Sequence, residues 1–282
     1  MKRPMQQLLA LERFHDVLKV STIAEPIESA SSSERAQKAL ETMKQKHFDV
    51  LALSENGEIV GYVAMTDLEG RDDLPEVVCG TFKKHFCDAD LVQESCPLGD
   101  CLRRLQVEER LFVHGLKRVD RIVTRADLHK QPVRMLIFSV ISLLEMALLS
   151  LIRKEYPDEQ EWRGLLSKKR LKEAEELLRK REKAGMEIDL IDCLQLGDKG
   201  TIVKKTKRLR LALGFDSNSI CDGFFGDLEK LRNALAHGQA FEAIPRLTLQ
   251  RVFDTFQRAQ DVLKKSIHLL EDEEEGEAKR AN

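Results

Sequence analysis

The sequence has almost no net charge and no closely spaced cysteine pair of the kind that binds zinc. Its 46 lysine and arginine residues nearly balance its 48 aspartate and glutamate residues, so the formal net charge is −2. Because such a chain has no global positive field, any binding of nucleic acid must come from a local basic patch. The six cysteines include no C-x-x-C pair, which favours reduced thiols. A zinc site from Cys79, His85 and Cys87 is the alternative, and we predict no metal site.

The sequence also lacks a secretory signal pattern and has a single long apolar run. Charged and amide side chains interrupt the N-terminus early, at Lys2, Arg3, Gln6, Gln7, Glu12 and Arg13, where a signal peptide would be apolar. The apolar run Met135–Ile152 carries one charge, Glu145, near its middle. Since a central carboxylate costs a few kcal/mol in a bilayer, we expect a mostly buried helix at an interface. We therefore predict a cytoplasmic protein with no membrane contact.

Length and composition are those of two globular domains. The chain has 282 residues, of which 42% are hydrophobic and 33% are charged, enough for two cores with much exposed helix. We place an α/β domain at 1–130, after an amphipathic lead-in helix at 1–20, and an all-α domain at 131–270. The acidic segment 271–282, EDEEEGEAKRAN, is predicted to be a disordered tail.

The first half contains an internal repeat of predicted β-α-β-β-α order. In its first copy, alternating apolar residues and a Glu55-Asn56-Gly57 turn signal predict strands at Ile27–Ser31, Asp49–Leu53 and Ile59–Ala64. The second copy has the corresponding segments at Leu91-Val92, Leu111–Leu116 and Val119–Val123. The segments AMTDL (Ala64–Leu68) and TRADL (Thr124–Leu128) lie 60 residues apart, which indicates a duplicated unit.

These repeats resemble a pair of CBS repeats, a module that usually binds adenine nucleotides between its two halves. In that family a T-x-x-D element holds the nucleotide, with the aspartate on the ribose and the threonine near phosphate. The second repeat keeps this element as Thr124 and Asp127, whereas the first has Ala64 in place of the threonine and keeps only Asp67. The resemblance implies one site for AMP, ADP or ATP as a regulator. The alternative is that these residues only cap helices.

The second half contains a helix, LEKLRNALAHG at Leu228–Gly238, whose polar and apolar faces separate clearly. At 100° per residue, apolar side chains share one face, those of Phe224, Leu228, Leu231 and Leu235. Asn233 and His237 project from the opposite side, Arg232 lies between, and Gly238 suits a left-handed C-cap. His237 is therefore predicted to face away from the core.

Arg232, Asn233 and His237 suit the cleavage of RNA by its own 2′-hydroxyl. An imidazole moves protons near neutral pH, a guanidinium holds phosphate with two hydrogen bonds, and neither step needs a metal. Arg232–His237 (RNALAH) resembles the R-N-x-x-x-H motif of HEPN domains, all-helical modules that are often ribonucleases. The resemblance implies an endoribonuclease that leaves 2′,3′-cyclic phosphate ends, acts as a toxin- or defence-like effector, and needs no cofactor for chemistry. Glu145 is a candidate partner that orients Arg232 or His237; a solvent-facing Glu145 is the alternative.

A dense basic run precedes this helix and is the candidate footprint for the RNA backbone. Its candidate RNA-binding residues are Lys204, Lys205, Lys207 and Arg208. A solvated helix face is the alternative for this run.

One motif helix is expected to be insufficient for catalysis. Arg232 and His237 are five residues apart, hence about 140° around a helix and roughly 7.5 Å along it, so they do not converge on one phosphate. We therefore expect a homodimer in which two such helices line one groove, as HEPN ribonucleases generally do. An antitoxin or regulatory protein is a further expected partner. The alternative function is a non-catalytic module that binds RNA, nucleotide or protein and is dimerised by the repeats.

Overall fold

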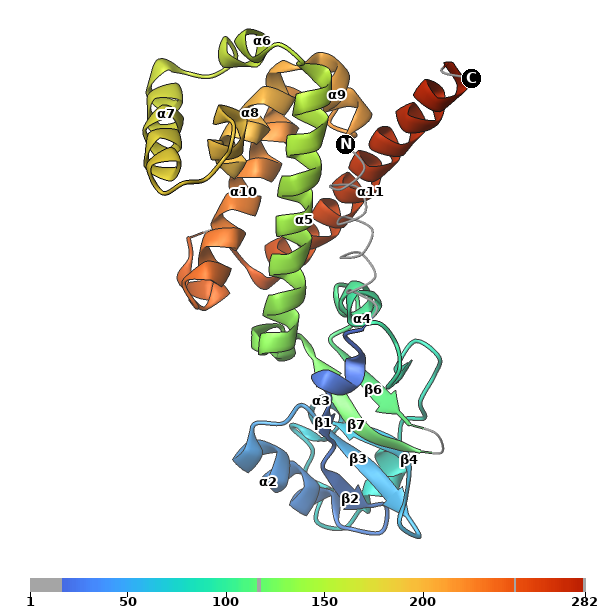
Figure 1. The fold of residues 1–282 in the computed structure, drawn as a ribbon. Coiled ribbons are helices and arrows are strands. Elements are labelled where there is room, and N and C mark those ends of the chain that lie inside the picture. Colours follow the sequence, from blue (N-terminus) through green and yellow to red (C-terminus); the bar gives the residue numbers. More distant parts are fainter. Residues whose placement is uncertain (1–16, 116–117, 246, 281–282) are drawn as a thin grey trace. The chain divides into compact units, whose positions relative to one another are not determined.

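The computed structural model describes residues 17–115, 118–245 and 247–280, which form two compact units (Figure 1). The first unit is Val17–Pro132, and the second begins at Val133. The first is mixed α/β and the second is helical. Most of the predicted lead-in helix, residues 1–16, lies outside the described residues.

The first unit consists of two copies of a β-α-β-β arrangement, each followed by a short helical turn. The first copy comprises β2 (Ser29–Ser31), α2 (Ala36–Lys46), β3 (Val50–Glu55), β4 (Glu58–Ala64) and α3 (Met65–Leu68). The second copy comprises β5 (Leu91–Gln93), α4 (Leu98–Leu105), β6 (Arg110–His114), β7 (Val119–Thr124) and η3 (Arg125–His129). Three short elements stand outside the copies: η1 (Val20–Thr22), β1 (Glu25–Pro26) and η2 (Cys79–Phe82). The predicted duplication is therefore confirmed in the order of the elements.

The strand registers show that the two copies superpose with an offset of 60 residues. Val50 pairs with Ala64 in the first hairpin, and Arg110 pairs with Thr124 in the second. Each hairpin also has a register shift at the same place, between Leu53/Ser54 and between Val113/His114. A bulge that recurs at one position is a feature of the repeat, because it fixes where each hairpin bends. The first hairpin closes through Asn56 and Gly57, both with positive φ, as the turn signal predicted.

The two copies are joined by one crossing strand and share a core. The first sheet has the order β2-β3-β4, and the second has the order β1-β7-β6-β5, so β1 precedes the first copy in sequence but pairs with the second. The shared cluster of buried side chains combines Val50 and Ala64 with Phe112 and Val119. The copies are thus one folding unit, and the space between them is a fixed feature of it.

The second unit is built from helices that include most of the remaining chain. They are α5 (Gln131–Glu155), α6 (Glu159–Arg163), α7 (Lys168–Lys183), η4 (Leu190–Cys193), α8 (Leu196–Lys205), α9 (Lys207–Ala212), α10 (Asn218–Ala236), η5 (Phe241–Ala243) and α11 (Leu249–Arg280). Helices α8 and α10 pack closely because Gly200 has no side chain: a Cβ there would lie 2.5 Å from Cγ of Phe225. Asp227 on α10 accepts a 2.6 Å hydrogen bond from Arg251 Nε on α11, which joins α10 to the last helix.

The C-terminal end of α10 is fixed by a complete cap and by an arginine from α5. Gly238 has a φ of +64°, and the amide of Gln239 donates to the carbonyl of Ala234 at 3.0 Å, the pattern of a Schellman motif. Arg134, which is 92% buried, donates to the carbonyls of Ala234 and Gln239 at 3.1 Å each. The loop that follows the motif helix is therefore held in place, and the predicted C-cap is confirmed.

Helix α5 is the one described helix that is long and apolar enough to cross a membrane by length and composition. In its most apolar 18-residue window, 56% of the residues are buried inside the protein, as in the core helix of a bundle. Two large side chains on its remaining face, Met135 and Phe138, are 55% and 43% exposed.

One part of the helical unit differs from the expectation. Helix α11 continues to Arg280 through the acidic segment that the composition predicted to be disordered, because glutamate, alanine and lysine are strong helix formers. The short helix α6 follows α5, and its first turn is capped by Asp158, whose carboxylate accepts a 2.9 Å hydrogen bond from the Gln160 amide.

Candidate functional site

A cleft of about 710 Å³ lies between the two repeats of the first unit. Residues from both copies and from the chain before the first copy line it: Glu25, Pro26, Ile27, Glu28, His47, Phe48, Asp49, Val50, Glu109, Arg110, Ile122, Thr124, Arg125, Ala126, Asp127 and Lys130. Both polar positions of the predicted T-x-x-D element, Thr124 and Asp127, are therefore at the cleft. Asp67, the predicted weaker position, is not among its lining residues.

Asp127 is a buried carboxylate that forms a capping box with Thr124 at the start of η3. Its Oδ2 accepts hydrogen bonds from the Thr124 amide at 2.6 Å and from the Thr124 hydroxyl at 3.3 Å. These bonds satisfy the start of η3 and hold the threonine and the aspartate in one orientation. The alternative capping role is thus real, and it leaves the second oxygen, Oδ1, directed elsewhere.

Lys130 occupies that second oxygen. Its ammonium lies 2.7 Å from Asp127 Oδ1 and 2.7 Å from Glu25 Oε1, and it donates to the carbonyl of Ile23 at 2.6 Å. Burial opposes the charge of Lys130, but the hydrogen bonds and charges of Asp127 and Glu25 outweigh it and raise the pKa of Lys130. A ligand that hydrogen-bonds Asp127 Oδ1 must compete with this ammonium.

The corresponding position in the first repeat is arranged differently. Asp67 Oδ2 accepts from the Ala64 amide at 3.3 Å and lies 2.8 Å from Lys84 Nζ, but no threonine hydroxyl is present. The rings of Tyr62, Phe86 and Phe112 pack together in the core that the copies share, with the Phe86 and Phe112 centroids 4.7 Å apart. The first repeat therefore lacks the contact between a threonine hydroxyl and the aspartate that the second repeat has.

Two arginines at the cleft already have partners within the protein. Arg125 donates to the carbonyls at the end of α4, including those of Leu105 at 2.9 Å and Gln106 at 3.0 Å. Arg110 pairs with Glu109 at 2.8 Å. Arg125 thus serves as a helix cap, and Arg110 is the cation at the cleft that a phosphate would most readily recruit, since Glu109 is well exposed.

In the helical unit, Arg232 is held between two acceptors from different helices. Its Nη1 lies 3.5 Å from Glu145 Oε1 on α5, and its Nη2 donates to Asn233 Oδ1 at 3.1 Å. The predicted pairing of Glu145 with Arg232 is therefore present. Asn233, which we expect to position Arg232 or His237, accepts a hydrogen bond from Arg232. These two contacts fix the direction of the guanidinium.

His237 follows the last residue of α10 and is exposed to solvent. Its amide donates to the carbonyl of Asn233 at 3.0 Å, so the backbone is fixed while the imidazole projects away from the core. On the opposite face, Leu228 and Leu231 are fully buried. The predicted separation of faces is confirmed, although Leu235 is only partly buried and Ala234 takes its place in the core.

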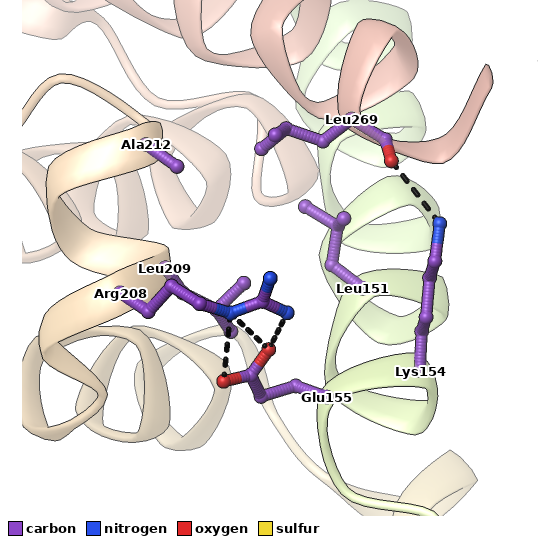
Figure 2. Close-up of a pocket in the computed structure, with 7 residues that line it drawn as sticks. All are labelled: Leu151, Lys154, Glu155, Arg208, Leu209, Ala212 and Leu269. Carbon is purple, nitrogen blue, oxygen red and sulfur yellow. Dashed lines mark hydrogen bonds and ion pairs between the residues drawn. The ribbon is translucent and has the colours of Figure 1, made fainter. Parts of the chain in front are cut away.

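Of the four candidate RNA-binding residues, three make contacts within the protein. Lys204 pairs with Asp222 at 2.8 Å, and Lys205 donates to the carbonyl of Leu165 at 2.6 Å. Arg208 lies against Glu155 beside a small apolar pocket, with Nε 3.0 Å from Oε2 (Figure 2). Lys207 is exposed on α9. The run therefore contributes to helix packing as well as to surface charge.

The described part of the chain contains no cluster of three or more His, Cys, Asp or Glu side chains arranged to hold a metal ion. The zinc alternative is disfavoured by position: Cys79 lies in the core of the first repeat, whereas Cys87 is exposed. Burial raises the pKa of Cys79, which opposes the thiolate form that zinc needs.

Three residues near these sites carried no recognisable signal in the sequence: Lys130, Arg134 and Lys199. Lys199 on α8 is 92% buried, although it stands in a run that reads as a solvated surface. Lys130 and Arg134 each reach a carbonyl 100 or more positions away, so spacing alone does not reveal these contacts.

No protein-family model matches the sequence, and no curated protein matches it. Solved structures of CBS domains resemble the N-terminal part. The CBS-pair protein CBSX2 of Arabidopsis thaliana is 20% identical over 42% of this chain and 95% of that chain, with a TM-score of 0.37. The structure of CBSX2 in complex with AMP is 21% identical over 42% of this chain and 97% of that chain, with a TM-score of 0.36.

A bacterial relative gives a similar result. The CBS domain of a bacterial Mg²⁺ transporter of the CNNM/CorC family, in complex with ATP, is 14% identical over 45% of this chain and 95% of that chain, with a TM-score of 0.36. Because these TM-scores are below 0.5, the assignment of two repeats rests on the strand order and registers of the protein itself.

Proposed function

We propose that this chain is a nucleotide-regulated, metal-independent endoribonuclease. The first unit would bind an adenine nucleotide in the cleft between its repeats, and the helical unit would cleave RNA through attack of its own 2′-hydroxyl. The HEPN type of the helical unit and the roles of its residues are part of this proposal.

The observation that best supports nucleotide binding is the position of Thr124 and Asp127 at a cleft of about 710 Å³, a volume in the range of small-molecule sites. Asp127 supplies an acceptor for ribose hydroxyls, and Thr124 lies beside it. Solved CBS domains that resemble this unit include complexes with AMP and ATP, which suggests the ligand class.

The observation that favours RNA cleavage is the geometry at the end of α10. Arg232 is directed by Glu145 and Asn233, and an exposed His237 follows five residues later. A phosphate bound to Arg232 gains charge in the transition state of transesterification, and a guanidinium stabilises that charge. His237 would transfer protons. The test is digestion of mixed RNA by the purified protein in EDTA, with and without nucleotide; RNA that stays intact under both conditions would favour the non-catalytic binding module.

We expect the first unit to bind adenosine more tightly when Lys130 is replaced by methionine. Lys130 competes with the ligand for Asp127 Oδ1. Removing this partly exposed ion pair frees the oxygen as an acceptor, which should raise the affinity for adenosine by up to about fivefold. Lys84→Met is the matched control, because Lys84 makes the same kind of contact with Asp67 in the other repeat. Calorimetry measures both; weaker binding by Lys130→Met would mean that Lys130 contacts the ligand and does not compete with it.

We expect the protein to form a homodimer through the exposed face of α5. Met135 and Phe138 are one turn apart and 55% and 43% exposed, and two motif helices would complete one groove. Sedimentation should give about twice the chain mass of 32.3 kDa, and Phe138→Asp should give a monomer without ribonuclease activity. Leu211→Asp is the control, because Leu211 is 46% exposed on α9. A monomer that cleaves RNA would contradict the composite groove.

A further inference from the structure

The cleft between the repeats has more carboxylates than cations in its lining. Five carboxylates line it, those of Glu25, Glu28, Asp49, Glu109 and Asp127. Three lysine or arginine side chains line it, those of Arg110, Arg125 and Lys130. Each phosphate group of a nucleotide brings further negative charge. A phosphate in this cleft must therefore be balanced by one of three cations, or it meets the carboxylates unbalanced.

Two of the three cations are committed to the fold. The Lys130 ammonium lies 2.7 Å from Asp127 Oδ1 and 2.7 Å from Glu25 Oε1. The Arg125 guanidinium donates to four backbone carbonyls at and after the end of α4, over distances of 2.9 to 3.2 Å. A phosphate that recruited either cation would break several contacts at once. Neither is therefore available to balance a phosphate.

Arg110 is the third cation of the lining, and Glu109 holds it. Arg110 Nη2 donates to Glu109 Oε2 at 2.8 Å, and the Glu109 side chain is 74% exposed. An exposed ion pair contributes little to stability, so one phosphate can take Arg110 from Glu109 at small cost. The Glu109 carboxylate then remains in the lining without its cation and repels any further phosphate.

The other charged groups at the cleft do not offset this repulsion. Glu28 is balanced from outside the lining by Lys46, whose Nζ lies 2.6 Å from Glu28 Oε1. Asp49 makes no ion pair with any residue of the described part of the chain. His47 is the remaining lining group that can become positive, and an imidazole is ordinarily neutral at about pH 8. A second or third phosphate therefore finds no cation at that pH.

The uncharged part of the lining suits the rest of a nucleoside. Apolar side chains line the cleft at Pro26, Ile27, Phe48, Val50 and Ile122. Apolar walls with a few fixed polar groups are typical of sites for small molecules, and such walls can cover the flat faces of a base. The cleft is thus better matched to a base and a ribose than to a chain of phosphates.

We propose that this cleft selects an adenine nucleoside or its monophosphate over the triphosphate, and that the pair of Glu109 and Arg110 sets this preference. Arg110 binds the first phosphate, and the carboxylates of Glu109 and Asp49 repel those beyond it. This inference rests on the proposed function in naming an adenine nucleotide as the ligand. It adds which of AMP, ADP and ATP the cleft accepts and which residues decide it.

The test is calorimetry of the full chain with adenosine, AMP, ADP and ATP at about pH 8 in EDTA. ATP should bind about tenfold more weakly than AMP, because its added charges meet carboxylates in a solvated site. Excess Mg²⁺, which binds nucleotide phosphates, should narrow this gap in a parallel titration without EDTA. A gap that Mg²⁺ leaves unchanged would mean that ATP is excluded by its size, which overturns the charge-based selection.

Three variants assign the preference to its residues. Glu109→Gln should raise the affinity for ATP by about fivefold, raise that for AMP as Arg110 is released, and leave adenosine unchanged. Arg110→Gln should reduce the affinity for AMP to that for adenosine or below. Glu58→Gln is the control, because Glu58 is an exposed glutamate of β4 outside the lining, and it should change none of these affinities.

The outcomes separate the selectivity from the proposed nucleotide site. ATP that binds as tightly as AMP in EDTA overturns the selectivity and leaves nucleotide binding intact. An equal gain for adenosine and ATP in Glu109→Gln, or an equal gain in Glu58→Gln, also overturns it. A wild-type protein that gives no heat with any of the four ligands contradicts the nucleotide site, and the selectivity with it.

Discussion

Replacing His237 with alanine should slow RNA cleavage by about a hundredfold or more, the typical contribution of a positioned proton-transfer group, while the fold and RNA binding remain nearly unchanged. The imidazole is exposed beyond the end of α10, and the helix cap is made by Gly238 and by Arg134 instead. Losing the ring therefore removes chemistry without opening the core.

The variants of Arg232 extend this prediction. Arg232→Ala should lose a comparable factor in rate, and Arg232→Lys should not restore it, because lysine lacks the planar fork that holds phosphate. His85→Ala is the control, since His85 is an exposed histidine of the other unit. Rates are measured with labelled RNA and binding with a 2′-O-methyl strand. Full activity of His237→Ala would assign the nuclease to a contaminant or another site.

Replacing Asp127 with alanine should remove the binding of adenine nucleotide, while Asp67→Ala should only weaken it. Asp127 lines the cleft, is 92% buried, and is aligned by the Thr124 amide and hydroxyl. Asp67 lacks the threonine partner, because Ala64 stands at the corresponding position. The ribose should therefore depend mainly on Asp127.

The two variants also control for each other's effect on stability. Both aspartates cap a short helical turn and contact a lysine, Lys130 or Lys84, so each substitution should cost about 1 kcal/mol of stability. Thermal unfolding should show equal losses of stability for the two variants, whereas calorimetry with AMP, ADP and ATP should show a larger loss of binding for Asp127→Ala. An Asp127→Ala protein with wild-type affinity, or a wild-type protein that gives no heat with any of the three, would remove the nucleotide site.

Local patterns predicted the parts of this structure that depend on neighbouring residues. The Asn56-Gly57 turn, the 60-residue repeat and the glycine that ends α10 follow from turn chemistry, hydrophobic alternation and helix capping. The same rules placed Asn233 and His237 on the exposed side of α10. These features need no knowledge of what packs against them.

Long-range contacts account for what the sequence did not reveal. Lys130 reaches the carbonyl of Ile23, 107 positions away, and Arg134 reaches that of Ala234. The run that contains Lys199 reads as a basic surface, but close packing of α8 against α10 buries its first lysine. A pattern of charges along the chain does not show which charged side chain is buried.

The central claim, RNA cleavage by a 2′-hydroxyl without a metal, is tested most directly by mass spectrometry of the fragments formed from mixed RNA in EDTA. A nuclease that uses Arg232 and His237 should leave 2′,3′-cyclic phosphate ends, with 5′-hydroxyl ends on the other fragments, and should leave DNA of the same sequence intact. These products should disappear with His237→Ala. Fragments with 3′-hydroxyl and 5′-phosphate ends, or RNA that remains intact, would contradict the account.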